Sequence, residues 1–156
     1  MNASFDSASV RQRYCIDASV AVRFYFSTEL QEKAERIYAA LIKQDMDFVA
    51  PSLILPEVSN AFRNNIRFHK FPLTVVREAF GDFLALPKLL IDPLVILEAA
   101  FDLSCAHDIS VYDAMYVAAC RLLSIPFVTA DKKLIGKIPA DQAKLIWLGD
   151  FEAAGA

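Results

Sequence analysis

Four acidic residues lie where apolar segments of the chain end or begin: Asp17, Glu57, Asp113 and Asp131. The two outer ones each follow a short apolar run, and the two inner ones lie near the start of apolar segments with helical spacing. Carboxylates that gather at one place raise each other's pKa, and a hard divalent cation removes that conflict. Carboxylate oxygens are the ligands that Mg²⁺ and Mn²⁺ prefer. We therefore treat the four as candidate catalytic and metal-binding residues.

Each acid also has an ordinary structural explanation. Asp17 could end a strand or cap the helix that follows it. Asp113 could complete a capping box with Ser110, three residues earlier. Glu57 could be a first-turn acid of a helix, and Asp131 a turn residue before two lysines. The chemical interpretation therefore requires that the fold bring the four together.

Two hydroxyl residues lie close to the outer acids. Ser19 follows Asp17 by two residues, and Thr129 precedes Asp131 by two. Hydroxyls at this spacing could orient the carboxylates or their waters. They could equally form hydrogen bonds at the ends of strands.

The pattern of apolar residues predicts five strands, at Arg13–Ile16, Phe48–Ala50, Leu89–Ile91, Pro126–Thr129 and Leu145–Leu148. Segments with helical periodicity separate them, at 20–26, 30–41, 52–69, 76–84, 93–103 and 111–123. This alternation predicts a three-layer α/β/α sandwich with a mostly parallel central sheet of about five strands. Ligands of such sheets bind at the carboxyl ends of the strands, where the acids are expected to lie.

Three local signals predict where helices begin. Thr28 and Gln31 have capping-box spacing before the second helix. Ser52 is the expected cap of the third helix, and Asp92 followed by Pro93 is an N-cap and first-turn pair.

Composition limits the class of protein. The chain has 156 residues, of which 56% are hydrophobic and 22% charged, which suits one domain with one core and excludes an extended disordered chain. We expect this domain at 13–150, between tails at 1–12 and 151–156. No apolar run reaches the roughly 18 residues of a membrane span, and the polar start is unlike a secretion signal. We expect a cytoplasmic protein without a membrane partner.

Other site classes are disfavoured. The three cysteines lack CxxC spacing and the two histidines are far apart, which argues against a disulfide framework or a zinc centre. The net charge of −3 argues against nucleic-acid binding through overall charge. It leaves open a nuclease whose own site is acidic.

Four short motifs carry a family resemblance, in this order along the chain: IDAS at 16–19, PEV at 56–58, SVYDAMY at 110–116 and TAD at 129–131. Their combination resembles PIN domains and, more narrowly, VapC-type toxins of toxin–antitoxin modules. The resemblance extends from about Arg13 to Asp150.

The resemblance implies a PIN-like fold and a Mg²⁺- or Mn²⁺-dependent endoribonuclease, with the catalytic acids at Asp17, Glu57, Asp113 and Asp131. Its products would carry 5′-phosphate and 3′-hydroxyl ends. It also implies an RNA substrate, a cognate antitoxin and a homodimer. The apolar helices at 53–68 and 75–86 are candidates for a homodimer interface or an antitoxin groove, although core burial explains their pattern too.

An RNA substrate needs cations and amides beside the acidic site. The candidate RNA-binding residues lie on the helix after Asp17, along the helix of Glu57 and directly after Asp131: Arg23, Asn60, Arg63, Asn64, Arg67, Lys132 and Lys133. A solvated helix face and a surface loop explain them as well.

Three other functions remain open from the sequence. A phosphatase or phosphotransferase of the haloacid-dehalogenase type would use Asp17 as nucleophile, but it expects a second acid where Ser19 stands. A receiver-like domain would use Asp92 as phosphoacceptor and Thr129 as a switch, but it expects an acidic pair near Asp17. A catalytically inactive PIN module would bind RNA or protein only, and the complete set of acids disfavours it.

Overall fold

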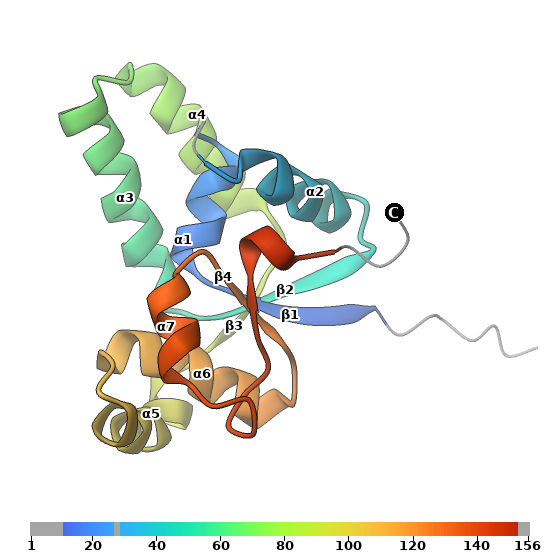
Figure 1. Cartoon of the computed structure of the whole chain (residues 1–156). Coiled ribbons are helices and arrows are strands. Elements are labelled where there is room, and N and C mark those ends of the chain that lie inside the picture. The colour runs from blue at the N-terminus through green and yellow to red at the C-terminus, as the bar shows by residue number, and fades with distance from the viewer. Residues whose placement is uncertain (1–10, 27–28, 153–156) are drawn as a thin grey trace, which may run out of the picture.

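The computed structural model describes residues 11–26 and 29–152, in which helices and strands alternate as the sequence predicts (Figure 1). The elements in chain order are β1 (Gln12–Ile16), α1 (Ala18–Ala21), a 3-10 turn (Val22–Phe24), α2 (Gln31–Ile42), β2 (Met46–Pro51), α3 (Ile54–His69), α4 (Leu73–Ala85), β3 (Leu89–Ile91), α5 (Pro93–His107), α6 (Val111–Leu123), β4 (Phe127–Thr129), α7 (Lys132–Lys137), β5 (Leu145–Trp147) and a second 3-10 turn (Leu148–Asp150).

The five strands form one sheet in the order β3-β2-β1-β4-β5, and every neighbouring pair is parallel. The chain builds the sheet outward from β1 to β3 and then returns to the other side of β1 with β4. The strand order therefore reverses between β1 and β4. In open parallel sheets, ligands bind at this point, outside the carboxyl ends of the strands.

Helices cover both faces of the sheet, which confirms the predicted three-layer α/β/α architecture. Helices α1 and α2 lie on one face and α6 on the other, with α5 packed against α6 (Figure 1). Seven consecutive residues of α6, 114–120, are buried, as expected for a helix that is apolar around most of its circumference. Helices α3 and α4 form a hairpin that projects away from the sheet (Figure 1).

Two local predictions are wrong. The helix expected at 20–26 is split into α1 and the 3-10 turn at Val22–Phe24. Ser52 does not cap α3, whose N-cap is Leu53 without a side-chain bond. The Ser52 amide instead donates to the Ile91 carbonyl at 2.9 Å, so this residue continues the pairing of β2 with β3. The predicted Thr28 cap lies outside the described residues.

The packed chain extends beyond the limits expected from the sequence. Gln12, expected in the amino-terminal tail, begins β1. Phe151, expected in the carboxyl-terminal tail, is buried and contacts the Tyr14 ring edge-on, with 5.3 Å between ring centroids. Within the described part of the chain, no helix combines the length and apolar character that a membrane crossing requires.

Candidate metal-binding active site

Asp17 lies directly after β1, at the point where the strand order reverses. Its side chain is 9% exposed and accepts three hydrogen bonds. The Ser19 hydroxyl donates to Oδ1 at 2.5 Å, the Val20 amide to Oδ1 at 3.1 Å, and the Thr129 hydroxyl to Oδ2 at 2.6 Å. Burial raises the pKa of Asp17 to about 6, the charge of Asp113 adds to the rise, and the three donors oppose it.

The two hydroxyl residues connect Asp17 to the end of β4. The Ser19 hydroxyl accepts from the Ala130 amide at 3.0 Å, and the Thr129 hydroxyl accepts from the Asp131 amide at 3.0 Å. Each hydroxyl can therefore give its own proton only to Asp17. The carboxylate is held in one orientation by groups from both central strand ends.

Glu57 lies in the first turn of α3, and its carboxylate is hydrogen-bonded to a tyrosine of α6. The Tyr116 hydroxyl donates to Oε2 of Glu57 at 2.5 Å. Burial raises the pKa of Glu57, the hydrogen bond from Tyr116 opposes this, and the charges of Asp17 and Asp113 add to the rise. Burial and the neighbouring Glu57 charge raise the pKa of Tyr116, so its hydroxyl keeps the proton that it donates.

Tyr116 is a residue of the site that the sequence pattern did not single out. The residue is 2% exposed and stacks on Phe127, with 5.6 Å between ring centroids. Such a side chain in an apolar helix is expected to belong to the core. The available signal was its spacing, because a residue three positions after Asp113 lies on the same side of the helix.

Asp113 lies in the first turn of α6 and forms the predicted capping box with Ser110. Its amide donates to the Ser110 hydroxyl at 3.0 Å, and that hydroxyl donates to Oδ2 of Asp113 at 2.7 Å. The expected helix cap is thus present. The Asp113 charge nevertheless raises the pKa of both Asp17 and Glu57. The charges of Asp17, Glu57 and Asp113 therefore influence one another across the strand ends.

Asp131 is in a different situation, although it follows the neighbouring strand. Its Oδ1 accepts from the amides of Lys133 at 2.8 Å and Leu134 at 3.3 Å, and so caps α7. The side chain is exposed. The carboxylates that raise the pKa of Glu57 are those of Asp17 and Asp113. The cap explains Asp131 without a metal ion.

The donor set fits a hard divalent cation. Asp17, Glu57 and Asp113 offer carboxylate oxygens from three elements, and their mutual repulsion is what a cation would relieve. As they stand, no three His, Cys, Asp or Glu side chains within residues 11–26 and 29–152 are close enough to hold one ion together. A shared ion would therefore need the three carboxylates closer together than they lie in this structure; Glu57 and Asp113 are both only half-buried.

The candidate RNA-binding residues separate into two groups. Arg23, Lys132 and Lys133 line one cleft beside Asp131. The other four lie along α3, where Arg63 borders a groove against α4 and the Arg67 guanidinium lies 5.0 Å from the centre of the Phe68 ring; this second group consists of Asn60, Arg63, Asn64 and Arg67.

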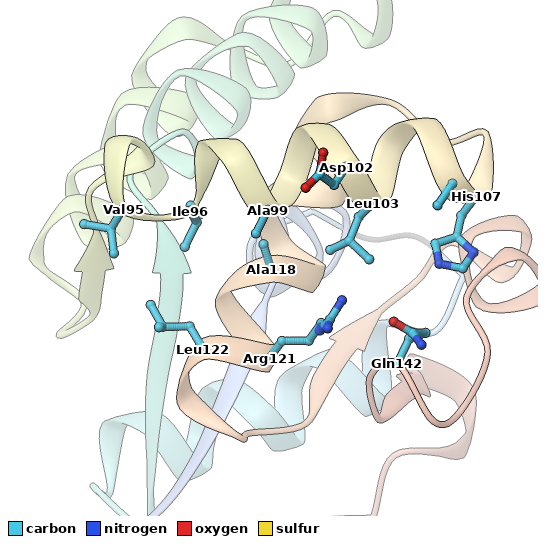
Figure 2. A pocket seen from close by; sticks show the side chains of 11 residues that line it. Val95, Ile96, Ala99, Asp102, Leu103, His107, Ala118, Arg121, Leu122 and Gln142 are labelled. Carbon is cyan, nitrogen blue, oxygen red and sulfur yellow. The ribbon is translucent and has the colours of Figure 1, made fainter.

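One cavity of about 530 Å³ lies elsewhere, between α5 and α6. Figure 2 shows Val95, Ile96 and Leu122 at one end and His107 and Gln142 at the other. None of the four candidate acids lines it. The cavity is therefore separate from the site at the strand ends.

The fold and the acids at the strand ends define a family of proteins. The family model of the PIN domain matches residues 14–138, and the chain belongs to this family. This confirms the family that the four short motifs predicted.

Particular relatives narrow the resemblance to VapC proteins. Ribonuclease VapC3 from Pyrobaculum aerophilum is 29% identical over 128 residues, which are 80% of this chain and 94% of that protein. The crystal structure of PAE2754 from the same organism has a TM-score of 0.66 at 19% identity, covering 89% of this chain and 92% of the other. VapBC2 from Rickettsia felis, bound to a DNA fragment from its promoter, has a TM-score of 0.63 at 12% identity, covering 87% and 98%.

Proposed function

We propose that this chain is a divalent-metal-dependent endoribonuclease, the toxin of a VapBC-type toxin–antitoxin pair. Membership of the PIN family and similarity to a VapC ribonuclease support this function. The structural observation that carries it is the buried Asp17 carboxylate, which is held by two hydroxyls and lies within electrostatic reach of Asp113. Burial disfavours the charged form of this carboxylate, and a bound cation would offset that cost.

We assign the metal to Asp17, Glu57 and Asp113, and we keep Asp131 as a fourth candidate, since both of its cap bonds to α7 use Oδ1. A bound Mg²⁺ or Mn²⁺ would lower the pKa of the attacking water and offset negative charge on the phosphate. Ser19 and Thr129 fix the direction of the Asp17 oxygens, since each directs its single proton at them.

The remaining residues of the site orient the Glu57 carboxylate and bind the RNA substrate. Tyr116 holds one oxygen of Glu57 and leaves the other available. Arg23, Lys132 and Lys133 line a cleft beside Asp131 and are suited to bind RNA phosphates. The RNA-binding surface would extend along the RNA strand through the candidate residues of α3: Asn60, Arg63, Asn64 and Arg67.

Metal-dependent cleavage of total RNA tests the proposal. The wild type should cut RNA with Mn²⁺ or Mg²⁺ and not with EDTA, and Asp113→Asn should abolish the cutting while the protein stays folded. Asp92→Asn is the matched control, because Asp92 also caps a helix, through Leu94 at 2.9 Å, but lies outside the site. Equal cleavage by both variants would exclude the metal site proposed here.

The phosphatase alternative loses support from the geometry. Ser19 occupies the position of the second acid, and its hydroxyl is already engaged with Asp17 and with the Ala130 amide. Hydrolysis of an aryl phosphate without cleavage of RNA would favour this alternative. Binding of RNA without cleavage at any metal concentration would favour an inactive PIN module.

An antitoxin is the expected protein partner, since the structural neighbours include toxin–antitoxin complexes. The groove between α3 and α4 has a volume of about 270 Å³, and its lining includes Phe62, Arg63, Ile66, Leu73, Val76, Arg77 and Phe80. It suits an apolar segment with acidic flanks, because arginines border its apolar side chains. Leu73→Asp should abolish complex formation with the product of the neighbouring gene and leave RNA cleavage intact, because Leu73 is 55% exposed.

The homodimer and the cytoplasmic location stay predictions. Leu94 and Phe101 of α5 are 80% and 60% exposed, which adds α5 to the helices at 53–68 and 75–86 as a candidate for the interface between two copies. Sedimentation equilibrium should give a dimer for the wild type and a monomer for Leu94→Asp. Cell fractionation tests the cytoplasmic location that an RNA substrate implies.

A further inference from the structure

A cleft of about 480 Å³ opens beside the acidic site, between the turn after α1, the start of α7 and the end of β5. Its wall is bonded to the candidate site, because the Ala130 amide donates to the Ser19 hydroxyl that holds Asp17. The cleft therefore lies beside the place where a phosphate bound at the acids would continue into the next nucleotide.

The cleft concentrates positive charge in a chain whose net charge is −3. Arg23, Lys132 and Lys133 all line it. Arg23 is held in place by bonds to the Ser19 carbonyl and, from Nε at 3.1 Å, to the Glu29 carbonyl. Two acids line the cleft as well, and one of them, Asp131, is engaged by the α7 amides.

The only tryptophan of the chain, Trp147, forms one wall of this cleft. The indole is fixed by its surroundings: a Cβ atom on residue 149 would lie 2.1 Å from the ring, so only glycine fits there. The Lys132 ammonium lies over the ring, 3.7 Å from its centre. A flat, partly exposed ring covered by the end of a long lysine side chain is suited to exchange that ammonium for a planar group.

We propose that this cleft binds one nucleotide of single-stranded RNA next to the bond that is cut. The nucleobase stacks on Trp147, and Lys132 moves from the ring to a phosphate, which Arg23 and Lys133 also contact. This proposal rests on the proposed ribonuclease function. Stacking accepts any base, so the subsite contributes affinity and position rather than sequence choice. It requires an unpaired base and therefore favours single strands over duplexes.

Tryptophan fluorescence tests the subsite directly, because Trp147 is the sole source of indole emission. The Asp113→Asn variant with Mg²⁺, which should bind RNA without cutting it, is titrated with a single-stranded octanucleotide RNA and with the corresponding duplex. We expect saturable quenching with the single strand and little with the duplex. Saturable binding of the single strand, measured by anisotropy, without any change in emission would overturn the proposal.

Substitutions in the Asp113→Asn background separate the contribution of Trp147 to RNA binding from that of Lys132. Trp147→Ala should weaken single-strand binding by about tenfold, as expected for loss of one stacked base. Trp147→Phe should recover much of it and preserves packing if the alanine variant fails to fold. Lys132→Ala should weaken binding, whereas Lys144→Ala, at the opposite end of β5, should not. Equal affinity for Trp147→Ala and the unsubstituted background would contradict the subsite.

Failure of the subsite and failure of the ribonuclease function give different results. If the chain with its native Asp113 cuts RNA, and Trp147→Ala cuts and binds it equally well, the subsite is wrong and the function stands. If no metal supports cleavage but RNA still quenches Trp147, the subsite stands and the function is wrong.

Discussion

The carboxyl ends of β1 and β4 lie side by side and carry the same type of residue in contrasting surroundings. Asp17 is buried, and two of its three hydrogen bonds come from side-chain hydroxyls. Asp131 is exposed, and both of its bonds come from the amides of the helix that it caps. A helix cap needs only a small polar side chain. A helix cap does not explain why the Asp17 carboxylate is buried beside other acids.

Asp17 and Asp131 therefore share a position at a strand end and differ in what surrounds their side chains. The sequence identified both residues by their place after a strand. Only the fold shows that the charges of Asp113 and Asp17 act on each other's surroundings and on Glu57, whereas Asp131 is bonded to the start of α7. Four predictions test whether this difference is functional.

The largest effect is expected from Asp17→Asn. We expect it to lower Mn²⁺-dependent RNA cleavage by about a thousandfold or more, the scale of losing several kcal/mol of metal-assisted stabilisation. Initial rates on one RNA measure it, and circular dichroism confirms the fold. A loss of less than tenfold would show that Asp17 is not a ligand.

The next effect is a dependence of stability on pH in EDTA. The pKa of Asp17 is raised from 3.8 to about 6, so folding favours the protonated form. Its contribution is fully present below about pH 4 and is lost as the pH rises through 6, by about 3 kcal/mol. The raised pKa of Glu57 acts in the same direction.

Urea unfolding between pH 4 and 7 measures this slope. Asp17→Asn should flatten it, whereas Asp131→Asn should leave it unchanged. An identical slope in the wild type and in Asp17→Asn would mean that other groups control the pH dependence.

A smaller effect is expected from Tyr116→Phe, which removes the donor to Glu57. We expect Mn²⁺ affinity to fall by about 10- to 100-fold, as for other groups that orient a ligand. Tyr112→Phe is the matched control, since Tyr112 is on the same helix and 63% exposed. In a Glu57→Gln background, Tyr116→Phe should change Mn²⁺ affinity little; an undiminished loss there would assign Tyr116 a different role.

The smallest effect concerns Asp131. We expect Asp131→Ala to lower the free energy of unfolding by about 1 kcal/mol, the usual value of a helix cap, and Asp131→Asn to leave it nearly unchanged. RNA cleavage by Asp131→Asn should fall far less than cleavage by Asp17→Asn. Equal losses in the two variants would make Asp131 a full member of the metal site.

The fold was largely predictable because its signals are strong. Short apolar runs alternate with amphipathic segments, and Asp92 and Ser110 cap their helices as expected. The Ser52 cap failed because the Ser52 amide pairs with Ile91. A local motif cannot reveal that an edge strand, 39 residues later, uses the same backbone.

The site was predictable in its residue types but not in its contacts. The acids could be found because strand ends converge in a parallel sheet. The bond between Tyr116 and Glu57 joins residues on two helices, and no pattern within either helix encodes it. Similarly, the contact of Lys132 with Trp147 depends on the packing of α7 against β5.

The central claim is that Asp17, Glu57 and Asp113 bind one divalent cation together. Titration with Mn²⁺, followed by the electron paramagnetic resonance signal of the free ion, tests this most directly. The wild type should show saturable binding that Asp17→Asn, Glu57→Gln and Asp113→Asn each weaken strongly and Asp92→Asn preserves. Undiminished Mn²⁺ binding in the first three variants would contradict the shared site.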